Sequence, residues 1–171
     1  MKKIIIISMI ALLIFWPRSS EASFETCHLS GAQRSYLQFS YVYGAPYGFG
    51  YTLAAIAMRE SMLGLYKINL QDPSAGLYHV TTDKVIRHFN WVDTPFNHNR
   101  AAQLMMEDPV LSAYLAVQEL KLWQRVHGKG NWRKIWASYN GGTRGNAAYG
   151  DIIAQNIQTI KDCGWLRHNY E

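Results

Sequence analysis

The chain has 171 residues, of which 49% are hydrophobic and 17% are charged. This composition excludes a disordered chain, and the length fits one domain with a sizeable core. The net charge of +5 falls to +3 if residues 1–22 are removed, because that segment holds three basic residues and one acidic residue. So mild a positive charge suits an anionic cell-envelope polymer and is too low to indicate nucleic-acid binding.

The first 22 residues have the layout of an export signal. Lys2 and Lys3 precede a predominantly apolar run over residues 4–16, and small residues at Ser20 and Ala22 follow. We expect residues 1–22 to be a signal peptide and residues 23–171 to form one domain in the periplasm or cell envelope. An uncleaved membrane anchor is the alternative, although a bilayer span needs about 20 apolar residues.

Cys27 and Cys163 are the two cysteines, and they lie near opposite ends of the expected mature chain. In an oxidising compartment such a pair predicts a disulfide that joins the two ends. Two separate buried thiols are the alternative. Neither cysteine lies in a motif typical of catalysis or of metal binding.

The first half of the expected domain alternates helical and turn-rich stretches. Residues 33–43 predict a short helix, and residues 44–50 predict an aromatic loop whose rings either stack on sugars or pack against the core. Residues 51–65 predict the central helix. Residues 68–80 predict an irregular stretch with short β structure.

The middle of the chain is less regular. Thr82 or Asp83 is a candidate cap for a helix over residues 85–89. Residues 91–99 predict a loop, and residues 101–106 predict a short helical turn.

Three helices are expected in the last third of the chain. They span residues 110–126, 132–139 and 146–160. Asp108 followed by Pro109 is typical of a helix start, Gly128 of a helix end, and Asn131 is placed to cap the second helix. These elements together predict a mainly α single domain with irregular connections and at most a minor β element.

Glu60 lies near the end of an almost wholly apolar helical run. Leu53, Ile56 and Ala57 precede it at spacings of three and four and therefore share its helix face. A carboxylate on such a face is poorly solvated, which favours the protonated acid that a glycosidase needs to protonate a leaving oxygen. The alternative is that Glu60 lies at the edge of the face with its carboxylate in water.

Three short motifs follow one another along the chain. They are Arg59-Glu60-Ser61, Ala75-Gly76-Leu77-Tyr78-His79-Val80 and Ala137-Ser138-Tyr139-Asn140-Gly141-Gly142. In this order they resemble the soluble lytic transglycosylase family, whose lysozyme-like domains carry a Glu-Ser, a Gly-Leu-Met-Gln and an Ala-Tyr-Asn-Ala-Gly. The resemblance covers roughly residues 51–153. It implies a lysozyme-like fold and an enzyme that cleaves peptidoglycan.

The resemblance implies that Glu60 is the catalytic acid and base of that cleavage. The implied substrate-binding residues are Ser61, Gly76, Leu77, Tyr78, His79, Tyr139, Asn140 and Tyr149. Gly76 is expected to permit a tight backbone near the sugar. Tyr139 either places its hydroxyl near the acid or is a plain core residue, and Asn140 either contacts substrate or only ends its helix.

The second motif departs from the family, since Tyr78 and His79 replace the methionine and the glutamine. A neutral histidine can still donate or accept one hydrogen bond, as the glutamine amide does. A protonated His79 beside Glu60 would instead weaken the acid. The departure therefore bears on substrate contacts and on the pH optimum.

Other polar residues form no recognisable constellation. The six histidines are scattered, so we expect neither a metal nor a cofactor. Asp72, Asp83 and Asp93 are each either a second acid of a hydrolytic lysozyme or a turn or cap residue.

Three functions remain open from the sequence. A lytic transglycosylase is favoured, a hydrolytic muramidase is the second, and a non-catalytic glycan-binding or assembly protein is the third. We expect a monomer whose partner is the glycan strand, in the service of a secretion, conjugation or pilus apparatus or as an exported phage-type lysin.

Overall fold

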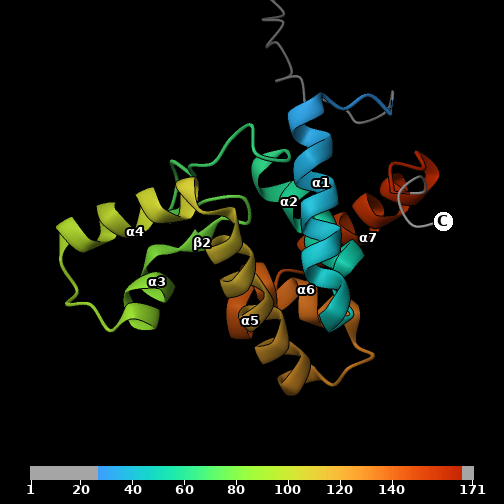
Figure 1. The fold of residues 1–171 in the computed structure, drawn as a ribbon. Helices are drawn as coiled ribbons and strands as arrows, with labels where there is room; N and C mark the ends of the chain where they lie inside the picture. Colours follow the sequence, from blue (N-terminus) through green and yellow to red (C-terminus); the bar gives the residue numbers. More distant parts are fainter. Residues whose placement is uncertain (1–26, 167–171) are drawn as a thin grey trace, which may run out of the picture.

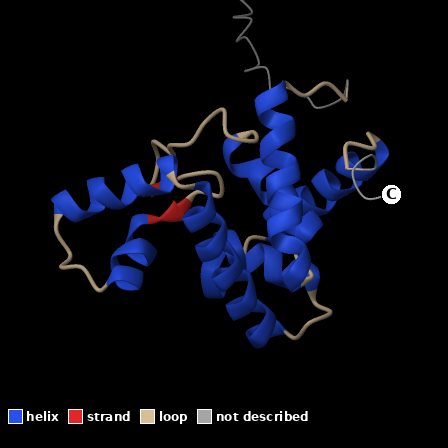
Figure 2. Ribbon diagram, viewed as in Figure 1, coloured by secondary structure: helices blue, strands red, loops and turns tan. Residues whose placement is uncertain are grey.

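Helices make up most of the chain in the computed structural model, which describes residues 27–166 (Figures 1 and 2). The helices and strands are α1 (Gly31–Gly44), the 3-10 helix η2 (Ala45–Tyr47), α2 (Gly50–Ser61), β1 (Ser74–Ala75), β2 (Val80–Thr81), α3 (Thr82–Phe89), α4 (Pro95–Glu107), α5 (Pro109–His127), α6 (Trp132–Gly141), the 3-10 helix η3 (Gly142–Arg144) and α7 (Ala147–Asp162). The prediction of a mainly α domain with a minor β element is confirmed. The predicted signal peptide, residues 1–22, lies outside the described residues.

The helix α2 is the centre of the packing. It lies against α1 on one side and α7 on another, while α6 packs on both α5 and α7 (Figure 1). Five consecutive α2 residues, from Leu53 to Ala57, have no exposed surface. The helices α3 and α4 pack on each other and extend to the left in Figure 1.

The helix α2 ends four residues earlier than predicted, at Ser61 rather than residue 65. Met62, Leu63 and Gly64 all have positive φ angles, which ends the helix. The Ser61 hydroxyl accepts the N–H of Gly64 at 2.9 Å. This turn sends the chain away from the helix axis immediately after Glu60.

The prediction of a loop over residues 91–99 is wrong, because α4 begins at Pro95 within this range. Thr94 caps this helix by accepting the N–H of Asn97, and Pro95 occupies the first helical position. Proline is favoured at that position, since its missing N–H would have no helical partner there. Pro95 therefore starts a helix that runs to Glu107, and residues 101–106, predicted as a short helical turn, are part of this longer helix.

The remaining helix predictions are confirmed, with local differences at the caps. Asp108 caps α5 by accepting two backbone N–H groups, and Asn146 caps α7 through the N–H of Tyr149. Thr81 is the N-cap of α3 in place of the predicted Thr82 or Asp83. Asn131 is the N-cap of α6, but its side chain donates to a backbone carbonyl of α5 rather than capping α6.

The stretch predicted to hold short β structure forms a small hairpin. The strands β1 and β2 pair antiparallel, with Ser74 opposite Thr81 and Ala75 opposite Val80. Residues 76–79 form the connecting loop, and they belong to the second of the three sequence motifs.

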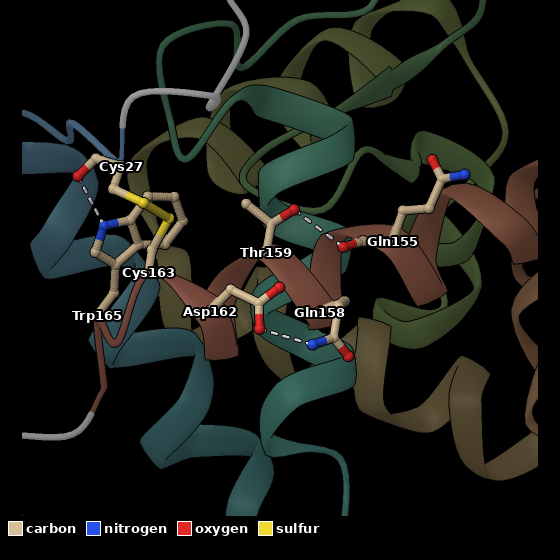
Figure 3. The surroundings of a disulfide bond; sticks show 7 residues. All are labelled: Cys27, Gln155, Gln158, Thr159, Asp162, Cys163 and Trp165. Carbon is tan, nitrogen blue, oxygen red and sulfur yellow. Dashed lines mark hydrogen bonds between the residues drawn. A yellow bond between two sulfur atoms is a disulfide. The ribbon is translucent and has the colours of Figure 1, made fainter.

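The predicted disulfide is confirmed. Cys27 is bonded to Cys163, 136 positions later, so the bond joins the start of the described chain to the end of α7 (Figure 3). The Trp165 indole N–H donates to the Cys27 carbonyl oxygen at 3.0 Å beside it. Within residues 27–166 no helix has the length and apolar character needed to cross a bilayer.

Candidate active site

Glu60 lies in the last turn of α2, at the end of the helix face formed by Leu53, Ile56 and Ala57. Those three side chains are fully buried, whereas 14% of the Glu60 side chain is exposed. The Glu60 side chain is therefore largely, but not fully, shielded from solvent. This is the environment that the spacing of the apolar residues predicted.

Two side chains from distant segments contact the Glu60 carboxylate. The Tyr149 hydroxyl, on α7, donates to Glu60 Oε1 at 2.5 Å. His79 Nδ1, in the hairpin loop, lies 3.3 Å from Glu60 Oε2. Burial, and next the nearby Glu60 charge, raise the pKa of Tyr149 well above its usual value, so the phenol remains a hydrogen-bond donor.

The loop that carries His79 is held in place by three helices. The Ser61 hydroxyl of α2 lies 2.8 Å from the Leu77 carbonyl oxygen. The Tyr139 hydroxyl of α6 donates to the Tyr78 carbonyl oxygen at 3.0 Å. The Tyr78 hydroxyl lies 2.9 Å from the hydroxyl of Ser40 on α1.

Ser61, Leu77 and Tyr78 were predicted to contact substrate, but each has at most 1% of its surface exposed. Their side chains lie away from solvent, in contrast to that prediction. Their contacts instead hold the backbone of the hairpin loop that carries His79, so they are positioning residues for this loop.

Gly76, predicted to permit a tight backbone near the sugar, is also buried and is closely packed. A Cβ atom at this position would lie 2.5 Å from the Met105 carbonyl oxygen and 2.7 Å from the Ser112 hydroxyl oxygen. Its φ angle is +85°, in the region that favours glycine. Gly76 thus permits the hairpin loop to pack against α4 and α5.

Tyr139 and Asn140 come from the end of α6. The Tyr139 ring stacks on the Tyr149 ring, with the centroids 6.4 Å apart. Its hydroxyl donates to the Tyr78 carbonyl oxygen of the hairpin, and Tyr139 lines the same hollow as Glu60, so it lies near the acid as predicted. Asn140 is exposed and accepts a hydrogen bond of 2.8 Å from Asn146, which links α6 to the start of α7.

Two hollows meet at Glu60. The residues that line both are Glu60, Asn69, Asp72, His79 and Asn140. The larger hollow, about 580 Å³, continues past Arg59 and Tyr149, and the smaller, about 80 Å³, continues past Lys84 and Tyr139. Glu60 therefore lies where the two polar hollows meet, and we call the two hollows together the groove.

Two further carboxylates, those of Asp72 and Glu119, line this groove. Asp72 accepts a hydrogen bond from the Ser74 hydroxyl and lines both hollows, and Glu119 of α5 lines the smaller one. Asp83 and Asp93, the other two aspartates considered from the sequence, line a separate hollow beside α3 instead.

Glu119 was missed in the sequence interpretation. It lies 3.1 Å from the Lys84 ammonium group and accepts the Trp123 indole N–H at 2.7 Å. The sequence gives no signal that singles it out, since Glu119 stands between the polar residues Gln118 and Lys121 in a helix with several polar positions. Its ion pair with Lys84 depends on tertiary packing and has no counterpart in the sequence pattern.

Within the part of the chain that the structure describes, no three His, Cys, Asp or Glu side chains are grouped so as to hold a metal ion. Comparison of the chain with protein-family models, with curated proteins and with solved structures finds no match. The function is therefore argued from the groove and its residues.

Proposed function

We propose that this protein is an exported peptidoglycan lytic transglycosylase with a lysozyme-like domain and with Glu60 as its general acid and base. The observation that carries the proposal is the position of Glu60. A mostly buried carboxylate lies at the meeting point of two hollows, with Tyr149 donating to Oε1 and His79 beside Oε2. A glycan strand bound along the groove would extend into both hollows, with Glu60 beside the sugars between them.

The proposed reaction needs one acid. Glu60 donates a proton to the oxygen between N-acetylmuramic acid and N-acetylglucosamine, and the glycosidic bond breaks. The resulting carboxylate then accepts the proton of the muramyl 6-hydroxyl, whose oxygen attacks the anomeric carbon of the same sugar. The product is a 1,6-anhydro end, and the enzyme recovers its proton.

The intramolecular nucleophile removes the need for a positioned water. Because the 6-hydroxyl belongs to the reacting sugar, its effective concentration is high. The Tyr149 hydroxyl stabilises the carboxylate that forms after the first proton transfer, since it donates directly to Oε1. No second carboxylate is required, unlike in ordinary retaining or inverting glycosidases.

A hydrolytic muramidase on the same scaffold is the second candidate. The observation in its favour is the presence of Asp72 and Glu119 in the groove. Either carboxylate could activate a water as a general base. Glu119 is already paired with Lys84, which leaves Asp72 as the better base for this reaction.

Product analysis on purified sacculi tests the proposal and separates the two reactions. In H2¹⁸O, a lytic transglycosylase releases fragments with anhydromuramyl ends and without the isotope. A muramidase releases reducing ends that carry ¹⁸O. Reducing ends would replace the proposal by the second candidate.

Two variants complete this test. Glu60→Gln removes the acid and is expected to abolish release of soluble fragments. Glu107→Gln is the matched control, because Glu107 is an exposed carboxylate on α4. If wild type releases no fragments and Glu60→Gln binds sacculi as well as wild type, the protein is a non-catalytic glycan-binding or assembly protein.

A further inference from the structure

His79 lies between two oxygen atoms, and the geometry determines which of its nitrogens carries a hydrogen. Its Nε2 is 2.9 Å from the Tyr66 carbonyl oxygen, and its Nδ1 is 3.3 Å from Glu60 Oε2. A carbonyl oxygen can only accept a hydrogen bond. Nε2 must therefore be the protonated nitrogen of a neutral His79 ring.

The contact with Glu60 then requires one more proton. A neutral ring protonated at Nε2 presents a lone pair on Nδ1, and an ionised carboxylate would present a second lone pair to it. The contact is attractive only when a proton lies on Nδ1 or on Oε2. In both arrangements the two residues hold one proton between them.

We propose that Glu60 and His79 share a single proton and that His79 is the positioning residue that keeps this proton at the catalytic acid. This inference rests on the proposed function for its catalytic meaning. The sharing itself follows from the contacts that the two side chains make.

The backbone supports this assignment. His79 has a φ angle of +43°, in the left-handed region that few residues other than glycine adopt. Such a conformation persists where surrounding contacts impose it, and here the preceding residues Leu77 and Tyr78 are bonded to α2 and α6. The imposed backbone directs the His79 ring to Glu60 and Tyr66.

The charged and titratable groups around His79 favour its protonation. Burial disfavours the imidazolium, but the hydrogen bonds with Glu60 and with the Tyr66 carbonyl and the charges of Glu60 and Asp72 outweigh it, so the pKa of His79 is raised. From α6 and α7, Tyr139 and Tyr149 face the same site as neutral phenols.

Three further charges line the two hollows around the pair. Arg59 lies in the larger hollow, and the ion pair of Lys84 with Glu119 lies in the smaller one. The opposite charges of Lys84 and Glu119 offset each other. Asp72 is therefore the main carboxylate, besides Glu60, that favours the proton on His79.

The shared proton fits both steps of the reaction. The pair donates one proton to the glycosidic oxygen and is left as a carboxylate and a neutral imidazole. It recovers one proton from the 6-hydroxyl, so the cycle closes without exchange with solvent. The enzyme is active as long as the pair keeps its proton.

The test is the high-pH limb of the pH–rate profile. In wild type this limb follows the last proton of the pair. The contacts of His79 raise the pKa of its ring, and His79→Gln removes that ring, so the limb is expected to move to lower pH. His88→Gln, at an exposed histidine of α3, is the matched control with an unchanged limb.

A second readout does not depend on activity. Titration of the His79 ring nitrogens by ¹⁵N NMR is expected to show Nε2 protonated throughout and a midpoint for Nδ1 that falls in Glu60→Gln. An unchanged midpoint, or an unchanged pH limb in an active His79→Gln enzyme, overturns the inference. If no variant cleaves sacculi but the midpoint falls, the shared proton holds and the proposed function fails.

Discussion

Gly76→Ala tests whether the glycine of the second motif serves packing or substrate binding. The added Cβ would lie 2.5 Å from the Met105 carbonyl oxygen, closer than real Cβ contacts occur, so α4 or the loop must shift. Such overpacking costs about 1–3 kcal/mol. The φ angle of +85° adds about 1–2 kcal/mol for a residue with a Cβ. We expect a total loss of about 2–5 kcal/mol in the free energy of unfolding.

Gly48→Ala is the matched control for this experiment. Gly48 has a φ angle of +75°, but no heavy atom lies within 4 Å of its added Cβ. This variant therefore carries the backbone cost without the clash, and the difference between the two variants isolates the packing term.

Urea unfolding with the disulfide intact, followed by circular dichroism, measures both variants. With a slope of about 1–3 kcal/mol per molar urea, the midpoint of Gly76→Ala is expected to lie about 1 M below that of Gly48→Ala. Equal midpoints would refute the packing argument. If Gly76→Ala kept its stability and lost only sacculus cleavage, the predicted approach of the loop to a sugar would be right.

Three further predictions concern contacts of the candidate site and of the termini. Tyr149→Phe removes the hydrogen-bond donor to Glu60 Oε1. Because a hydrogen bond to a charged group contributes about 1.5–3 kcal/mol, kcat/KM on sacculi is expected to fall about 10- to 150-fold. An unchanged kcat/KM contradicts the role of this bond. Replacing Cys27 and Cys163 by serine opens a loop that the disulfide closes over 136 positions. Urea unfolding is expected to show a loss of up to about 5 kcal/mol in the free energy of unfolding. Unfolding curves that match wild type refute this. Because folding raises the pKa of His79, its stabilising effect is complete below about pH 6.5 and is lost as pH rises through the folded-state pKa. The stability difference between wild type and His79→Gln, measured by urea unfolding, should therefore shrink as pH rises over this range, and a constant difference speaks against it.

Local sequence signals were sufficient for much of the fold. Asp108 and Pro109 predicted the start of α5 and Gly128 its end, because caps act on the backbone groups of their own helix end. The mainly α class followed from the three-and-four spacing of apolar residues. The disulfide followed from there being two cysteines and an expected oxidising compartment.

Some local signals were present but interpreted wrongly. Pro95 was treated as part of a loop, whereas Thr94 and Pro95 together start α4. Glu119 was not considered as a site residue, whereas it lines the groove. Thr94 and Pro95 are compatible with a loop or with a helix start, and a helix glutamate with a solvated face or with a site, so the packing of neighbouring segments decided both.

The sequence by itself determined that Glu60 shares a helix face with apolar residues, and that the chain is mainly α, because both depend on residues a few positions apart. Tertiary structure decided what surrounds that carboxylate. Tyr149 is 89 positions from Glu60, and the orientation of His79 depends on its own left-handed backbone and on the Tyr66 carbonyl. Such contacts join segments whose distance in space is set by the packing of whole helices, which no local pattern of residues encodes.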